Sequence, residues 1–239
     1  MRKHSRNTGI ILILIIFIGI ILGFKLINKK VTPILMITAK EESNKLATIV
    51  INDAIKKQVV EGLSFDKLFI ITYEKDEIAT IDFDSVIVNK VLSTITGTIQ
   101  SNLKYIEQGN VELIETSDNV LAHYDQDKLK DGIIYEVPLG LVYNNPFISN
   151  LSPKIPVKIH LIGSINSNIR TEVTNYGINN ALIEVYVDVE VNLQVILPFS
   201  SNETVTKTSV PLALKMVRGK IPEYYANGTN GPALSVPIS

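Results

Sequence analysis

The chain has 239 residues, of which 46% are hydrophobic and 20% are charged, proportions typical of a folded globular protein rather than a disordered one. Its formal net charge is −1, which excludes the overall basic field expected of a nucleic-acid-binding protein. Because the chain contains no cysteine, disulfides, thiolate metal sites, iron–sulfur clusters and cysteine nucleophiles are excluded as well.

An uncharged and strongly apolar segment runs from Thr8 to Phe24. A helix that crosses a bilayer needs about 20 mainly apolar residues, with roughly 17 as the lower limit. We therefore predict a short basic tail over residues 1–8 and a transmembrane signal anchor over residues 9–27, with Lys25 reaching toward the headgroups. A buried core helix is disfavoured because the segment is apolar on all sides. A cleaved signal peptide competes more strongly, although no small-residue cleavage pattern follows the apolar run.

The charges around this segment do not by themselves decide its orientation, because basic residues stand on both sides of it. A long C-terminal domain is translocated largely regardless of flanking charge. We therefore expect the rest of the chain to lie outside the cytoplasm. The basic residues concerned are Arg2, Lys3, Arg6, Lys25, Lys29 and Lys30.

The next segment has the pattern of an amphipathic helix over about residues 34–60. Asp53 stands four residues before Lys57, which is the favoured order of an acid and a base on a helix surface. Gly62 follows as the expected C-cap.

Two strands and a second helix are predicted after it. Residues 68–73 and 77–83 read as a β-hairpin. Asp84 or Ser85 then caps a helix that Gly109 ends. Its apolar residues return at helical spacing and predict packing against a sheet: Val88, Val91, Leu92, Ile95, Ile99, Leu103 and Ile106.

Long alternating runs dominate the C-terminal third. Residues 133–142 predict a strand, and residues 143–156, with three prolines, predict a connection without regular structure. Apolar and polar residues then alternate over 155–173, over 183–195 and again over 210–216. Such runs predict antiparallel strands with one apolar and one polar face. Because 17 residues would span roughly 55 Å, the sheet has to twist and curl.

The predicted fold class is therefore α+β. An N-terminal transmembrane helix is followed by two amphipathic helices that pack on an elongated antiparallel sheet with long C-terminal strands. The expected domains are a single α+β domain over residues 28–228 and a flexible tail over residues 229–239, after the tail and anchor described above.

One loop offers candidate metal ligands. His123, Asp125 and Asp127 lie close together, with Asp131 nearby, and carboxylates are the ligands that hard cations prefer. The spacing lacks the glycine at the sixth place and the glutamate at the twelfth place of a calcium loop. A solvated acidic loop is the favoured interpretation.

Other catalytic candidates are few. His4 lies in the N-terminal tail, and His160 falls on the polar face of a predicted strand, where a surface role is favoured. Asp82 and Asp84 would share one strand face as paired carboxylates, but Asp84 is better explained as a helix cap. No nucleophile elbow, phosphate-binding loop or zinc-protease motif occurs. We therefore predict a non-enzyme with no catalytic residue, no cofactor-binding residue, no cofactor and no metal site.

Five stretches carry a resemblance to a known family: Ile51–Ile55 (INDAI), Gly132–Gly140 (GIIYEVPLG), Asn150–Val157 (NLSPKIPV), Tyr176–Val185 (YGINNALIEV) and Met216–Tyr225 (MVRGKIPEYY). Together with the single predicted anchor, they resemble the YunB sporulation protein family over about residues 35–228. The resemblance implies a role in endospore formation, in the mother cell. It carries no established catalytic activity and no catalytic residue.

Three functions remain open at this stage. The favoured one is a membrane-anchored, non-catalytic structural or interaction protein required for sporulation, with protein partners and no nucleic acid. The second is a lipid- or apolar-ligand-binding module at the forespore membranes, in which helix and sheet enclose a groove. The third is a cell-wall enzyme that uses His160, Asp82 or Asp125. By resemblance, the anchor would lie in the mother-cell or outer forespore membrane.

Overall fold

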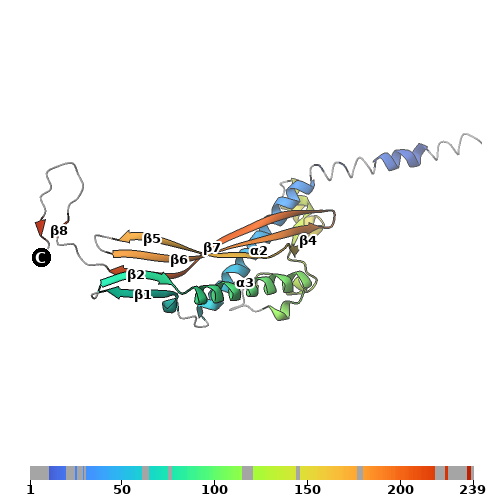
Figure 1. Cartoon of the computed structure of the whole chain (residues 1–239). Coiled ribbons are helices and arrows are strands. Elements are labelled where there is room, and N and C mark those ends of the chain that lie inside the picture. Colours follow the sequence, from blue (N-terminus) through green and yellow to red (C-terminus); the bar gives the residue numbers. More distant parts are fainter. Residues whose placement is uncertain are drawn as a thin grey trace, which may run out of the picture. The chain divides into compact units, whose positions relative to one another are not determined.

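A computed structural model describes most of the chain between residues 31 and 218, together with a few short stretches nearer the two ends of the chain (Figure 1). The described part divides into two compact units. Unit 1 comprises residues 1–50, 100–164 and 191–206, and unit 2 comprises residues 51–99, 165–190 and 207–239. The described residues are 11–19, 25, 29, 31–60, 65–74, 77–114, 121–143, 146–176, 180–218, 224–225 and 236–237.

The predicted anchor is only partly described. Residues 11–19 form a helical segment with exposed side chains. No helix within the described residues combines the length and the apolar character needed to span a membrane. Within the predicted anchor at 9–27, the structure describes residues 11–19 and Lys25. The rest of the anchor and the basic tail at 1–8 lie outside the described residues. The anchor therefore stays a prediction.

The two long helices that the sequence predicts are present. Helix α2 (Thr32–Val60) passes from unit 1 into unit 2, and helix α3 (Ser85–Gln108) passes from unit 2 into unit 1. Asp84 caps α3, because its Oδ1 accepts from the backbone N–H groups of Val86 at 2.9 Å and Ile87 at 3.1 Å. Five residues of the predicted apolar stripe of α3 are buried, and Val88 and Leu92 are half-buried. Gly62 lies outside the described residues.

Unit 1 contains most of the shorter elements. They are η3 (Val111–Leu113), α4 (Gln126–Lys130), β3 (Tyr135–Pro138), η4 (Leu139–Tyr143), α5 (Pro146–Leu151) and β4 (Lys154–Leu161). In unit 2, η2 (Phe65–Leu68) leads into the predicted hairpin of β1 (Phe69–Glu74) and β2 (Glu77–Phe83), and β5 (Asn166–Tyr176) belongs to the main sheet. Two further short strands, β8 (Tyr224–Tyr225) and β9 (Val236–Pro237), pair with each other.

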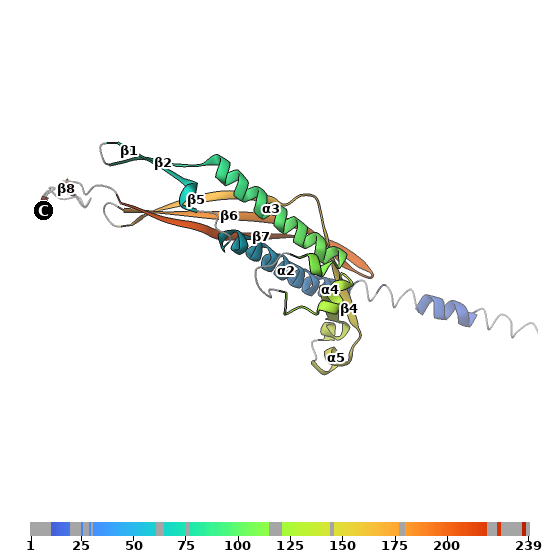
Figure 2. The same cartoon turned by 90° about the horizontal axis from the view of Figure 1, so that it is seen from below.

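The main sheet is built around β6 (Asn180–Leu197). β4 pairs antiparallel with residues 193–196 of β6, and β5 pairs antiparallel with residues 180–190, so both lie on one edge of this strand. β7 (Ser200–Arg218) also pairs with β6, and β3 extends the sheet beyond β4. The predicted α+β class with long antiparallel strands is confirmed. Figure 2 shows the same elements from below.

Three sequence-based expectations were wrong in detail. The alternating run over 155–173 is two strands, because Gly163 adopts a φ of +68° between β4 and β5. The strand predicted over 133–142 stops at Pro138 and continues as the η4 turn. The connection over 143–156 contains α5, which begins at Pro146, a residue suited to the first turn of a helix because it has no N–H to leave unpaired.

One face of β6 supplies core residues to both units. Every second side chain from Ile183 to Leu197 is at most 6% exposed, while the side chains between them are half-buried. In unit 1, Asn44 of α2 reaches β7, where its Oδ1 accepts from the hydroxyls of Thr206 at 2.9 Å and Thr204 at 3.1 Å. In unit 2, the hydroxyls of Thr96 in α3 and Ser167 in β5 lie 2.5 Å apart. Helix and sheet are thus in direct contact within each unit.

The end of α3 depends on a glycine. Gly109 has a φ of +75°, a conformation that other residues rarely adopt. A Cβ added to Gly109 would lie 2.0 Å from the carbonyl oxygen of Lys130 at the end of α4. The two helix ends can approach this closely only because no side chain separates them.

Replacing Gly109 with alanine should therefore destabilise the protein by about 2 kcal/mol or more, through backbone strain and the clash with Lys130. Chemical denaturation measures this loss. Gly97→Ala is the matched control: a Cβ there meets nothing within 4 Å, and alanine favours the helix interior by up to about 1 kcal/mol. Equal stability of the Gly109 variant and the wild type would contradict the close approach.

Candidate pocket in unit 1

A pocket of about 820 Å³ lies in unit 1 between α2, the loop before α4, α4 itself, β3 and the junction of α5 with β4. This volume is within the range usual for ligand sites in proteins. Its lining mixes charged, polar and apolar side chains: Glu42, Lys45, Ile49, His123, Tyr124, Asp125, Lys128, Ile134, Tyr135, Glu136, Pro138, Asn150 and Lys154.

Helix α2 forms one wall. Glu42, Lys45 and Ile49 face the pocket together because they are three and four residues apart on the helix. The Nζ atom of Lys45 is 3.9 Å from the Glu42 carboxylate, and the lysine side chain is largely exposed. An exposed pair at this separation contributes little to stability. Glu42 is therefore only weakly neutralised.

The acidic loop forms a second wall, but its carboxylates do not converge. Asp125 caps α4, accepting from the backbone N–H groups of Asp127 at 3.2 Å and Lys128 at 3.4 Å. The Asp127 side chain is almost fully exposed, with Lys130 at 3.8 Å. Among the residues that the structure describes, no group of three histidine or acidic side chains is placed to hold a metal ion. In this loop, the protein uses Asp125 to begin a helix.

Lys128 and Glu136 form the tightest ion pair of the pocket. The Lys128 Nζ donates to Glu136 Oε2 at 2.6 Å and lies 3.5 Å from Asp125 Oδ2. The hydrogen bond to Glu136 raises the pKa of Lys128. One cation thus neutralises two of the three acidic residues that line the pocket.

Tyr124 carries a hydroxyl that has no such partner. Burial, with a further contribution from the Glu42 carboxylate, raises the pKa of Tyr124 from 10.0 to about 12. Its hydroxyl oxygen is buried and has no hydrogen-bond partner within the described structure. The phenol is therefore a neutral, unused donor in the pocket wall.

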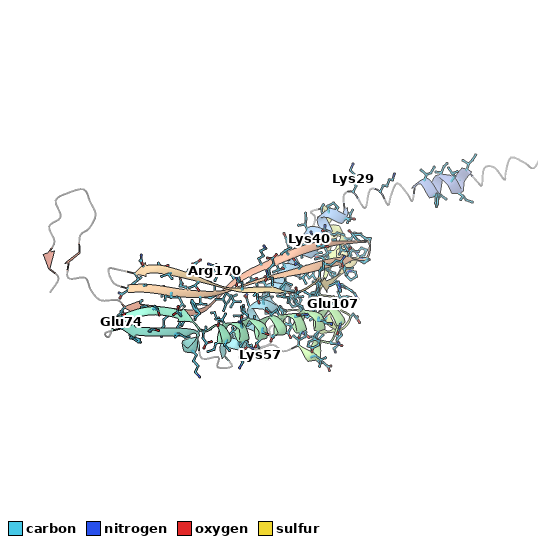
Figure 3. The ribbon with its side chains drawn as sticks, viewed as in Figure 1. Lys29, Lys40, Lys57, Glu74, Glu107 and Arg170 are labelled. Atoms are coloured by element: carbon cyan, nitrogen blue, oxygen red, sulfur yellow. The ribbon has the colours of Figure 1, made fainter. Side chains whose placement is uncertain are left out.

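The remaining predicted candidates have structural partners elsewhere. His160 Nδ1 lies 2.6 Å from Oε1 of Glu107, which is labelled in Figure 3 at the end of α3. Glu107 Oε2 accepts from the Leu161 N–H at 3.2 Å. In unit 2, Asp82 accepts from the hydroxyl of Thr80 at 3.2 Å. His160 and Asp82 are not among the residues that line the pocket, and His4 lies outside the described residues.

Unit 2 has a polar cluster that sequence reasoning missed. Arg170 of β5, labelled in Figure 3, donates through Nε to Asp188 of β6 at 2.9 Å and also pairs with Glu172. The Ser209 hydroxyl of β7 donates to Asp188 at 2.5 Å, and these hydrogen bonds from Ser209 and Arg170 lower the pKa of Asp188. The guanidinium lies 4.8 Å from the ring centre of Tyr186. The cluster joins three strands.

The pocket itself was also only partly predicted. The acidic loop was singled out from sequence, but Glu42, Glu136 and Lys154 were not. The alternating and helical patterns indicate which side chains face outward on each element. They do not indicate which outward faces of distant elements meet.

Comparisons with known proteins give the family. The sporulation protein YunB family matches residues 134–224 of the chain. Sporulation protein YunB of Bacillus subtilis (strain 168) is 33% identical over 219 residues, which cover 90% of this chain and 80% of that protein. The chain belongs to the YunB family of sporulation proteins. No solved structure matches it. The resemblance read from sequence is confirmed, and the matched YunB segment includes the β3, α5 and β4 residues of the pocket.

Replacing Tyr124 with phenylalanine should leave stability unchanged or raise it by about 1 kcal/mol, because the variant no longer buries an unpaired hydroxyl. Chemical denaturation at neutral pH measures the difference. Because the pKa is raised from 10.0 to about 12, the tyrosine contributes stability below pH 10 that is lost as pH rises toward 12. The variant should lose this part of the alkaline destabilisation.

Tyr73→Phe is the control, since this side chain is exposed and its hydroxyl is in solvent. It should change stability by less than about 0.5 kcal/mol. A clear loss of stability in the Tyr124 variant alone would mean that the hydroxyl has a partner in the folded protein.

Proposed function

We propose that this YunB-family chain is a membrane-anchored, non-catalytic interaction protein required for endospore formation. The observation that carries the proposal is the pocket of unit 1, in which Lys128 pairs with Glu136 and Asp125 while Glu42 and Lys154 keep charges that a partner can meet. Catalysis by acids, bases or nucleophiles needs a group whose pKa is shifted toward its task beside a second group that assists it. The mixed charges of this pocket favour recognition of a partner surface.

The roles of the other candidate residues support the same view. Asp84 caps α3, and His160 joins β4 to the end of α3 through Glu107. Each therefore has a contact that accounts for it without a reaction. The expected partners are proteins of the sporulation machinery, and the charge of −1 does not favour nucleic acid.

The anchor and the location belong to the proposal as well. The uncharged segment from Thr8 to Phe24 supports a single span, and the family supports a role in sporulation. The domain after the anchor would lie on the extracytoplasmic side of the mother-cell or outer forespore membrane. There it would hold or position its partners.

Binding of lipid or another apolar ligand is the second candidate. It is favoured by apolar side chains that are exposed near the ends of β5 and β7 in unit 2, namely Val173, Leu214 and Met216. Val173 pairs with Ile183 and so shares the apolar face of β6. Against it, Val185, Val187 and Val189 on the same face are at most 2% exposed. The apolar face is thus covered along most of its length.

The anchor has a direct test. Placing aspartate at both Ile13 and Ile16 in the full chain should release it from membranes in sodium carbonate, because a charge near the bilayer centre costs about 2.5–3.5 kcal/mol. The number of heat-resistant spores should fall in parallel. Ile37→Asp is the control, since this exposed isoleucine lies in α2 beyond the predicted anchor, and it should stay in the membrane fraction. Release of the wild-type chain by carbonate would contradict the proposal.

A further inference from the structure

Two large apolar side chains stand exposed beside the pocket of unit 1. Phe147 is 81% exposed and Leu151 is 89% exposed. They are four residues apart on α5 and so project from the same face, and Asn150 between them lines the pocket. Large apolar side chains that are exposed together often mark an interaction site.

The position of α5 is held by its own hydrogen bonds. The Ser152 Oγ accepts from the Gly140 N–H at 2.8 Å and donates to the Ser149 carbonyl at 2.8 Å. These bonds tie the end of α5 to η4 without covering Phe147 or Leu151. A surface that is already ordered loses little conformational entropy when a partner binds.

The charges of the pocket that remain available have both signs. Lys154 is exposed and stands opposite Pro138 in the β3–β4 ladder, with no ion pair in the described part of the chain. Within the part of the chain that the structure describes, Glu42 pairs only with the distant ammonium of Lys45, at 3.9 Å. A complementary ligand therefore offers an acid to Lys154, a base to Glu42 and apolar surface to α5.

This combination points to a polypeptide. An anionic lipid headgroup would satisfy Lys154 but would meet the weakly neutralised carboxylate of Glu42 in the same pocket and would leave the base-binding site unused. A neutral sugar would leave the two apolar side chains of α5 without a contact. A peptide segment carries acidic, basic and apolar side chains within a few residues, and a volume of about 820 Å³ admits several of them.

We propose that the pocket and the exposed face of α5 together bind a segment of a protein partner that carries an acidic, a basic and a large apolar side chain. The inference rests on the proposed function, because it names where the interaction protein meets its partner. The apolar side chain of the partner packs on Phe147 and Leu151. Its acid pairs with Lys154 and its base pairs with Glu42.

The test begins by identifying the segment. A photoreactive amino acid replaces Asn150 in the full-length chain in sporulating cells, and Val86, an exposed residue of α3 in unit 2, is the control position. Cross-linking at position 150 should join the chain to one protein segment, which peptide sequencing by mass spectrometry shows to contain an acid, a base and a large apolar residue. The control position should not give this product.

The second step measures affinity with a synthetic peptide of that segment and the full chain in detergent. The double variant Phe147→Ser/Leu151→Ser should weaken binding by about tenfold or more, as loss of an exposed apolar anchor does. Lys154→Glu should also weaken it, and exchanging the acid of the peptide for lysine should restore binding to this variant. Leu113→Ser, at an exposed leucine of η3 in the same unit, should bind as the wild type does.

Several results would overturn the inference. They are an absence of protein adducts at position 150, adducts to lipid only, the same adduct at position 86, or a peptide affinity that neither the α5 variant nor Lys154→Glu changes. If the anchored chain remains necessary for spores while one of these results is found, the inference fails and the proposed function stands. If cross-linking succeeds but carbonate releases the chain, the anchor fails instead.

Discussion

Burial of one face of β6 is the constraint on which both units depend. Valine, leucine and isoleucine occupy every second position of this strand from Ile183 to Leu197, and each is almost completely buried. Each such side chain contributes about 1.5–3 kcal/mol relative to an exposed one. Because side chains alternate between the two faces, a shift of one residue in the pairing with β5 would mismatch the apolar and polar faces of the two strands over residues 180–190. Apolar residues of α2 and α3 are buried as well, and each helix contacts a strand of the same sheet, α2 through Asn44 to β7 and α3 through Thr96 to β5.

This arrangement also bears on function. Because the side chains of the apolar β6 face are buried in the core, the proposed binding of a partner must use the surfaces around that face. In unit 1 these are the mixed-charge pocket and the exposed side chains of α5. In unit 2, the polar face of the sheet is occupied by the Arg170 cluster, which joins three strands through Asp188 and Ser209. The proposed partner contacts therefore use side chains that the core does not need.

The long elements could be predicted from sequence because their signals are local. The helical stripe of α3, its cap at Asp84 and the alternation of β6 each depend on neighbouring residues. The break at Gly163 was missed because the apolar alternation continues through it, and only its positive φ ends the strand. The pocket was mostly missed because it joins segments from residue 42 to residue 154, and the Arg170 cluster because its partners depend on strand register. Such contacts are set by tertiary packing, which periodicity does not report.

Hydrogen exchange on the full-length protein tests the sealed face of β6 most directly. The account predicts that the amides of residues 183–197 exchange more slowly than those of β1 and β2, close to the rate of global unfolding, and that phosphatidylglycerol vesicles leave them unchanged. Exchange of these amides as fast as in the β1–β2 hairpin would contradict the account. So would protection that arises only when the lipid is added, because the face would then be an open groove.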